Sequence, residues 1–285
     1  STTNVVIANG LSFYPIINGT ALANNITVAT GGSAAITVTG TGTLKVAGLI
    51  SSSNGINATA GTIELIGSAS QSVRADNFVS NEISNLKISN TLSAAAAGNP
   101  SVAISVAGGM LNISGTVSFG NLDNAYLQTN DQLTLLSSAT ATASVADITN
   151  NNVNSGNNIA GKIVIERYIP GKRAWRLLTA PVTPASQVKM SDAWQEGAAS
   201  VTNPAVINAS NNPNPGYGTH ITYGNPASNG YDQGLNGNTS ICYLTTTGWN
   251  GVPSGTNSGA VINSGYITDQ PGYMLFVRGD RSTQL

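Results

Sequence analysis

Short stretches in which β-branched and polar residues alternate recur through the first 160 residues, separated by Gly, Asn and Ser. Alternation with a period of two, bounded by turn residues, is the pattern of β-strands. The stretches include "NITVA" from residue 25, "TLKVAG" from 43, "TIELIG" from 62, "NLKIS" from 85, "MLNIS" from 110 and "LTLLS" from 133. No segment carries a sustained helical period with caps. We therefore expect an all-β chain.

The spacing of these stretches distinguishes two all-β architectures. Their starts lie 18 to 25 residues apart, which suits one pass of a β-solenoid stacked on the pass before. A sandwich of antiparallel hairpins would show a turn signal about every 8–12 residues. The spacing favours a parallel β-helix-like solenoid over residues 1–160, with the sandwich as the alternative. Asn residues that open strands, such as Asn25 and Asn85, are expected to form ladders between stacked passes.

The composition changes near residue 160. Five of the 16 aromatic residues and two of the 11 prolines precede it, and the others follow it. We expect a second domain at 161–285, a loop-rich β module that caps the solenoid. Its opening stretches "GKIVIERYI" and "RLLTAPV", joined by "PGKRAW", predict a β-hairpin.

Basic residues concentrate in this hairpin, because five of the 11 Lys and Arg of the chain fall between residues 162 and 182. No His, Cys or paired acid accompanies them, which argues against a catalytic site, although a polyanion patch stays open. We interpret Arg167, Tyr168, Trp175 and Arg176 as a structural junction between the two domains. The two guanidinium groups would face each other across the strands and stack on the rings.

Five motifs in order, "VIERYIPGKRAWRLLTAPV", "SDAWQEG", "GYGTHITYG", "NGYDQ" and "YMLFVRGDRS", span about residues 160 to 285. Their succession resembles a module of large adhesin-like proteins that Bacteroidetes bacteria secrete to the cell surface through the type nine secretion system. The resemblance implies an extracellular location and a role in adhesion or envelope architecture. It implies no reaction. Those proteins carry a C-terminal sorting domain that this sequence lacks, so we expect a fragment of a longer chain.

Composition argues against several functional classes. Only 8% of residues are charged and the net charge is -1, which disfavours an electrostatic grip on nucleic acid. No apolar run approaches the roughly 20 residues of a membrane-spanning helix. Cys242 is the only cysteine and His220 the only histidine, so no disulfide is possible within the chain and a zinc site has too few ligands. We expect no metal and no cofactor.

A sugar-cleaving solenoid is the serious enzymatic alternative. Such an enzyme needs two carboxyl groups at a defined separation along one groove. The only grouping of charges apparent in residues 1–160 is Arg74, Asp76, Glu82 and Lys87, and surface ion pairs explain it equally well. No G-x-S-x-G motif occurs. We predict no catalytic residues and no enzymatic activity.

Aromatic residues in the second domain are the candidate ligand-binding residues. Tyr217, Tyr223 and Tyr231, with Trp194 and Trp249, would suit a sugar-stacking platform, although packing beneath loops is an alternative. The "RGD" at 278–280 is interpreted as a turn after a strand. We therefore expect a non-enzymatic, extracellular surface protein of the adhesin type, whose partners are secretion machinery, other surface proteins or glycans. A carbohydrate-binding surface protein and a polysaccharide-active enzyme are the alternatives.

Overall fold

The computed structural model describes residues 3–30, 35–120, 123–149, 153, 155–170, 172–179, 239–251 and 272–277. Over these residues the protein is all-β, and its only helical elements are two short 3-10 turns, η1 (Ala75–Asn77) and η2 (Val106–Gly108). The chain divides into two compact units, Ser1–Ile169 and Pro170–Leu285.

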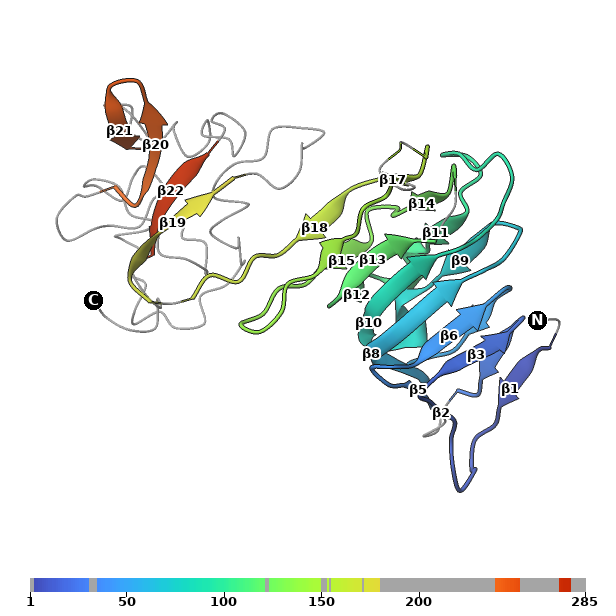
Figure 1. The fold of residues 1–285 in the computed structure, drawn as a ribbon. Coiled ribbons are helices and arrows are strands. Elements are labelled where there is room, and N and C mark those ends of the chain that lie inside the picture. The colour runs from blue at the N-terminus through green and yellow to red at the C-terminus, as the bar shows by residue number, and fades with distance from the viewer. Residues whose placement is uncertain are drawn as a thin grey trace. The chain divides into compact units, whose positions relative to one another are not determined.

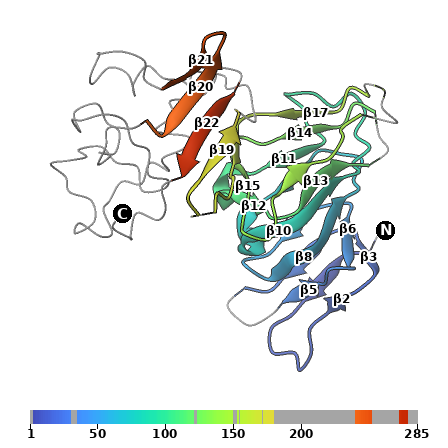
Figure 2. The ribbon, with the colours of Figure 1, turned by 60° about the vertical axis from the view of Figure 1, so that its left-hand side comes forward.

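Three parallel sheets build the first unit, and in each sheet the strands lie side by side in chain order (Figures 1 and 2). The first sheet contains β1 (Val5–Ile7), β4 (Ile26–Val28) and β7 (Ile50–Ser51). The second contains β2 (Ile16–Ile17), β3 (Thr20–Ala23), β5 (Ile36–Val38), β6 (Thr43–Val46), β8 (Ile56–Leu65), β10 (Phe78–Ile88), β12 (Leu111–Ile113), β13 (Thr116–Phe119), β15 (Leu133–Leu135), β16 (Ser144–Val145) and β18 (Ile163–Ile165). The third contains β9 (Gln71–Val73), β11 (Val102–Ile104), β14 (Tyr126–Gln128) and β17 (Asn158–Ala160).

Every pairing between the named strands of this unit is parallel. The alternative of antiparallel hairpins is therefore wrong for these residues. Partners lie one pass of the chain apart: Thr43 pairs with Thr62, and Thr62 with Asn85, at separations of 19 and 23 residues. We call a set of strands that pair one above another a column. The predicted strands near 25 and 110 lie outside the column that contains Thr43, Thr62 and Asn85, because β4 lies in the first sheet and β12 pairs with the first half of β10. Some of the intervals seen in the sequence therefore mix two columns.

A continuous hydrophobic core runs through the stacked strands. Alternation along each strand turns every second side chain inward. In β6, for example, Leu44 and Val46 are buried while Lys45 lies on the opposite face. Successive passes bring apolar residues into register, as where Leu44 pairs with Ile63 and Ile63 with Leu86. Each pass therefore covers the apolar face of its neighbours, and the buried cluster extends from Ile7 to Ala143.

Asparagine amides connect neighbouring passes. The Nδ2 of Asn25 donates to the Oδ1 of Asn4 over 3.0 Å, and the Oδ1 of Asn25 accepts from the backbone N of Leu49 over 2.7 Å. The predicted ladder is thus confirmed at Asn25. At Asn85 the amide oxygen instead accepts from the backbone N of Thr116. Gly115 precedes that residue, and a Cβ there would lie 2.6 Å from the same oxygen, which explains the glycine.

The predicted hairpin at 162–182 is wrong. Its first half, β18, pairs in parallel with β15, and its second half, β19 (Ala174–Leu178), pairs antiparallel with β22 (Tyr273–Val277). The parallel register sets Ile163 beside Leu133 and Ile165 beside Leu135, so both isoleucines pack against the core of the first unit. A hairpin would forgo that burial, which explains why the strand continues the stack.

The described part of the second unit is one antiparallel sheet. Its strands run in the order β19, β22, β20 (Ile241–Thr245) and β21 (Gly248–Gly251). Strand β22 is central, and its Tyr273, Leu275 and Val277 are buried on one face together with Ile241 of β20. This sheet has its own hydrophobic face, which accounts for its compactness as a separate unit.

Candidate functional site

Three charged residues lie side by side on the second sheet. Lys45 of β6 is in register with Glu64 of β8, and Glu64 is in register with Lys87 of β10. Two positions before them, Thr43, Thr62 and Asn85 are in register with one another in the same way. We call Lys45, Glu64 and Lys87, with Ser89, the charge ladder. It is the most concentrated set of ionisable groups among the described residues of the first unit.

The glutamate is enclosed by its neighbours. Its Oε2 lies 2.9 Å from the Nζ of Lys45, and its Oε1 lies 3.2 Å from the Nζ of Lys87. The hydroxyl of Ser89 also donates to Oε1 over 2.6 Å. Glu64 retains only 4% of its accessible surface, whereas both lysine side chains are partly exposed. The ladder thus presents two ammonium groups outward and covers the carboxylate.

These contacts keep the carboxylate ionised. Burial raises the pKa of Glu64, but the hydrogen bond from Ser89 and the two lysines outweigh burial, so the pKa lies below its ordinary value. A general acid requires the opposite shift, towards the working pH. Both carboxylate oxygens are engaged and nearly inaccessible, so this group fits an ion-paired structural role rather than catalysis.

Replacing Glu64 with glutamine is expected to lower the free energy of unfolding by about 1–2 kcal/mol, because two lysines lose their counter-charge while keeping access to water. The pKa of Glu64 is lowered on folding, so its ionic contribution is present above the unfolded pKa and lost as the pH falls through the folded one. Urea unfolding between pH 7 and pH 3 should show the stability advantage of wild type over Glu64→Gln shrinking as the pH falls, because wild type loses its ionic contribution. Glu82→Gln, on the neighbouring strand β10, is the control. Equal acid sensitivity of Glu64→Gln and wild type would contradict this role.

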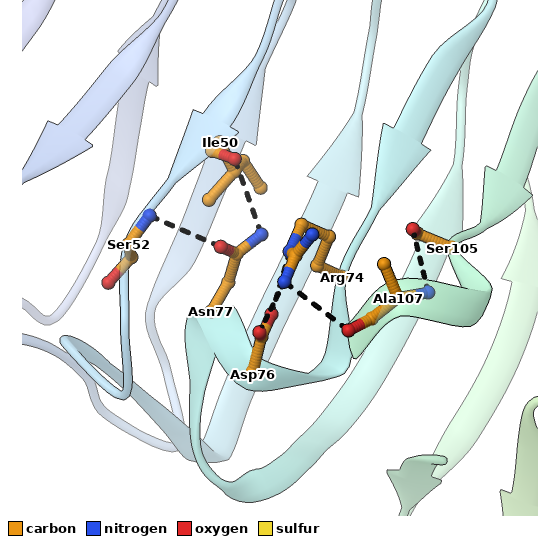
Figure 3. A network of polar contacts seen from close by, with 7 residues as sticks. All are labelled: Ile50, Ser52, Arg74, Asp76, Asn77, Ser105 and Ala107. Carbon is orange, nitrogen blue, oxygen red and sulfur yellow. Dashed lines mark hydrogen bonds and ion pairs between the residues drawn. The ribbon is translucent and has the colours of Figure 1, made fainter. Parts of the chain in front are cut away.

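A second ionic contact lies between the two 3-10 turns, shown in Figure 3. The guanidinium of Arg74 binds both carboxylate oxygens of Asp76, at 2.9 and 2.5 Å, and also donates to the backbone O of Ala107 in η2. The Arg74 hydrogen bond lowers the pKa of Asp76. The sequence grouping of these two with Glu82 and Lys87 is wrong, because Lys87 binds Glu64 instead.

Asn77, next to this pair, replaces a strand contact. Its side chain is buried, its Oδ1 accepts from the backbone N of Ser52, and its Nδ2 donates to the backbone O of Ile50 (Figure 3). The amide therefore supplies hydrogen bonds to the backbone of β7, the last strand of the first sheet. At this place the chain forms η1 instead of a fourth strand.

Two further acids are also held by hydrogen bonds. The backbone N of Lys162 donates to Asp131 over 2.7 Å, and both the backbone N and the hydroxyl of Thr149 donate to Asp147 over 2.8 Å. These donors lower the pKa of Asp131 and of Asp147. Within the described residues, no three His, Cys, Asp or Glu side chains come close enough together to hold a metal ion.

The predicted junction residues make separate local contacts. Arg167 donates to the backbone O of Glu166, and the backbone N of Tyr168 donates to Ser137. Trp175 of β19 packs its ring against Phe276 of β22, with centroids 5.1 Å apart. Arg176 is on β19, so the expected face-to-face arrangement of Arg167 and Arg176 across a hairpin is wrong.

Trp175→Ala should lower the stability of the antiparallel sheet by about 1 kcal/mol, because the tilted ring pair with Phe276 is lost. Thermal unfolding of the full chain, followed by circular dichroism, measures this. Trp249→Ala is the matched control, since among the described residues Trp249 forms no ring pair. Equal melting temperatures for the two variants would contradict a stabilising ring pair.

The predicted sugar-binding tyrosines, Tyr217, Tyr223 and Tyr231, lie outside the described residues, as do Trp194, His220 and the "RGD" at 278–280. Trp249 lies on β21 and is exposed. Cys242 is half-buried on β20.

The sequence contained one unused indication of the charge ladder. Lys45, Glu64 and Lys87 each stand third in the stretches "TLK", "TIE" and "NLK".

No helix in the described part of the chain is both long and apolar enough to cross a membrane. Comparison of the chain with protein-family models, with curated proteins and with solved structures found no match.

Proposed function

We propose that the first unit is a β-solenoid and that the protein is a non-enzymatic, extracellular surface protein of the adhesin type. The observation that carries this proposal is the stack of parallel strands, in which strands pair with strands one pass away and the passes share one core. A solenoid grows along one axis by adding passes and so provides an extended body of repeated surface.

The chemistry of the acids supports a structural role. Glu64, Asp76, Asp131 and Asp147 each have a lowered pKa and a hydrogen-bond donor or cation that holds them ionised. A glycosidase of the common type needs one protonated and one ionised carboxyl group beside its substrate. Glu64 and Asp131 instead connect neighbouring passes, and Asp76 and Asp147 make local contacts with Arg74 and Thr149.

The motifs of residues 160–285 support an extracellular location through their resemblance to type nine secretion substrates. On that basis, secretion machinery, other surface proteins and glycans are the proposed partners. The small number of charges, 8% of residues, agrees with binding through polar and aromatic contacts rather than through a strong electrostatic field.

Antibody labelling of the source bacterium tests the location. Intact cells should bind an antibody raised against the full chain, and cells with disabled type nine export should bind it only after permeabilisation. Labelling that always requires permeabilisation would overturn the surface assignment. Incubating the purified chain with neutral and acidic polysaccharides tests the non-enzymatic part, because release of new reducing ends would contradict it.

A further inference from the structure

The charge ladder carries more positive charge than its own pairing requires. Lys45 and Lys87 flank a single carboxylate, that of Glu64, so one positive charge is left in excess. Residues 1–160 contain only three basic residues, and two of them meet here. One lysine would be enough to neutralise the glutamate, so ion pairing alone does not account for the second.

Both ammonium groups keep hydrogen-bond donors for a further partner. A lysine ammonium has three N–H donors, and among the described residues each of the two lysines is paired with Glu64 alone. The lysine side chains are 32% and 39% exposed, whereas the glutamate side chain is 6% exposed. A group that approaches from solvent therefore meets two ammonium groups, held in place by a carboxylate that they cover.

A second row of polar side chains runs beside the ladder on the same face of the sheet. It consists of Thr43, Thr62, Asn85 and Thr116, and we call it the threonine row. These residues lie on β6, β8, β10 and β13, which are neighbours in the sheet (Figure 1). Side chains two positions apart on a strand point to the same face, as Thr43 and Lys45 do. The three threonines are half-buried and their hydroxyls form no hydrogen bond with any described residue, so they are open to a ligand.

We propose that the charge ladder and the threonine row together bind a polysaccharide in which single carboxylates are separated by neutral sugars. A ligand carboxylate that bridges Lys45 and Lys87 neutralises the excess charge through charge-assisted hydrogen bonds. Sugar hydroxyls donate and accept hydrogen bonds, as do the hydroxyls of the threonine row. This inference rests on the proposed function and deepens it, because it assigns an acidic glycan to a surface protein whose proposed partners include glycans.

The repeat of the sheet suits an extended sugar chain. Neighbouring strands lie about 4.8 Å apart, which is close to the length of one pyranose unit in such a chain. Successive sugars can therefore meet successive members of the threonine row while one carboxylate reaches the ladder.

Charge distinguishes this ligand from a nucleic acid. Binding to a phosphate backbone requires a patch of several Lys and Arg residues. The ladder has one charge in excess, the whole chain has a net charge of -1, and Arg74, the other basic residue before residue 160, is bound to Asp76. A ligand with one carboxylate among many hydroxyls matches this balance.

Binding of the full chain to immobilised hyaluronan, measured by biolayer interferometry, tests the inference, because a uronate alternates with a neutral sugar in this polymer. Wild type should bind, and should bind the methyl ester of hyaluronan about tenfold more weakly or less, because the ester lacks the charge. Lys45→Gln and Lys87→Gln should each weaken binding about tenfold, through loss of a charged hydrogen-bond donor. Lys162→Gln is the matched control, because it makes the same change at a lysine paired with Asp131 outside the ladder. Its binding should equal that of wild type.

The threonine row is tested by a substitution without any change of charge. Thr62→Val removes one hydroxyl from the row and should weaken binding about threefold. Thr27→Val is its control, because Thr27 is an exposed strand threonine on β4 of the first sheet. Lys87→Arg keeps the positive charge and should bind more tightly than Lys87→Gln. Unchanged circular dichroism and melting establish that each variant is folded.

Four results would overturn the inference. Wild type that does not bind hyaluronan lacks the site, and equal binding of hyaluronan and its ester would show that the carboxylate is not recognised. Equal weakening by Lys162→Gln and the two ladder variants would place the attraction outside the ladder. Duplex DNA bound as tightly as hyaluronan would indicate a site for polyanions in general. The surface location is tested separately by antibody labelling, so failure of this inference and failure of the proposed function are distinguishable.

Discussion

Leu86→Ala is expected to lower the free energy of unfolding of the first unit by about 4 kcal/mol. Leu86 lies in the second half of β10, the longest of the described strands, and is fully buried. It is in register with Ile63 of the preceding pass and Val117 of the following one. Since both neighbours are held by strand pairing, the surrounding backbone has little freedom to close the cavity.

Urea unfolding of the full chain, monitored by circular dichroism, measures this loss, and Leu49→Ala is the control. Leu49 is 62% exposed, so the same substitution should change stability by less than about 0.5 kcal/mol. A loss below about 1 kcal/mol for Leu86→Ala would mean that the stack collapses around the gap and that passes are not rigidly in register. Amide exchange should show the largest loss of protection in β8, β10 and β13.

The sequence predicted which segments are strands better than it predicted their partners. Alternation of Leu44, Lys45 and Val46 identifies a strand with one inward face, because this pattern is local. Which column a strand joins depends on loop lengths and on interruptions. Strand β8 shows the difficulty, since its 10 residues cover both β5 and β6 of the preceding pass.

The hairpin at 162–182 failed for a related reason. Two strands joined by a short turn with Pro and Gly suggest a hairpin from local evidence alone. The alternative was a distant partner, β15, whose Leu133 and Leu135 offer Ile163 and Ile165 a place in an existing core. Burial against the stack is a non-local effect, and only the register of earlier passes reveals it.

The charge ladder was missed because charges were grouped by closeness along the chain. Arg74 and Asp76 are close in sequence and do pair, but Lys45, Glu64 and Lys87 are brought together by strand register. In a stacked parallel fold the informative distance is one pass. Even with the correct register, the sequence does not show that the flanking lysines cover the glutamate, because that depends on side-chain conformation.

Gln71 joins three successive passes through a completely satisfied amide. The side chain is only 4% exposed. Its Nε2 donates to the backbone O of Val46 and of Gly48, both over 3.0 Å. Its Oε1 accepts from the backbone N of Gly67 over 2.8 Å and from the Nδ2 of Asn90 over 2.9 Å. One amide thus fills four hydrogen-bonding positions at the turn where β9 opens the third sheet.

Gln71→Leu is expected to cost about 3 kcal/mol, because leucine keeps the approximate size of the side chain but leaves several buried backbone and amide groups without partners. Gln128→Leu is the matched control, since Gln128 lies on β14 of the same sheet and its side chain has no hydrogen bond among the described residues. That variant should change stability by less than about 0.5 kcal/mol. Urea unfolding gives both values, and faster amide exchange at Gly67 should accompany the loss in Gln71→Leu. Equal stability of the two leucine variants would contradict the role of Gln71, because it would mean that water replaces all four hydrogen bonds and that the turn is not sealed against solvent.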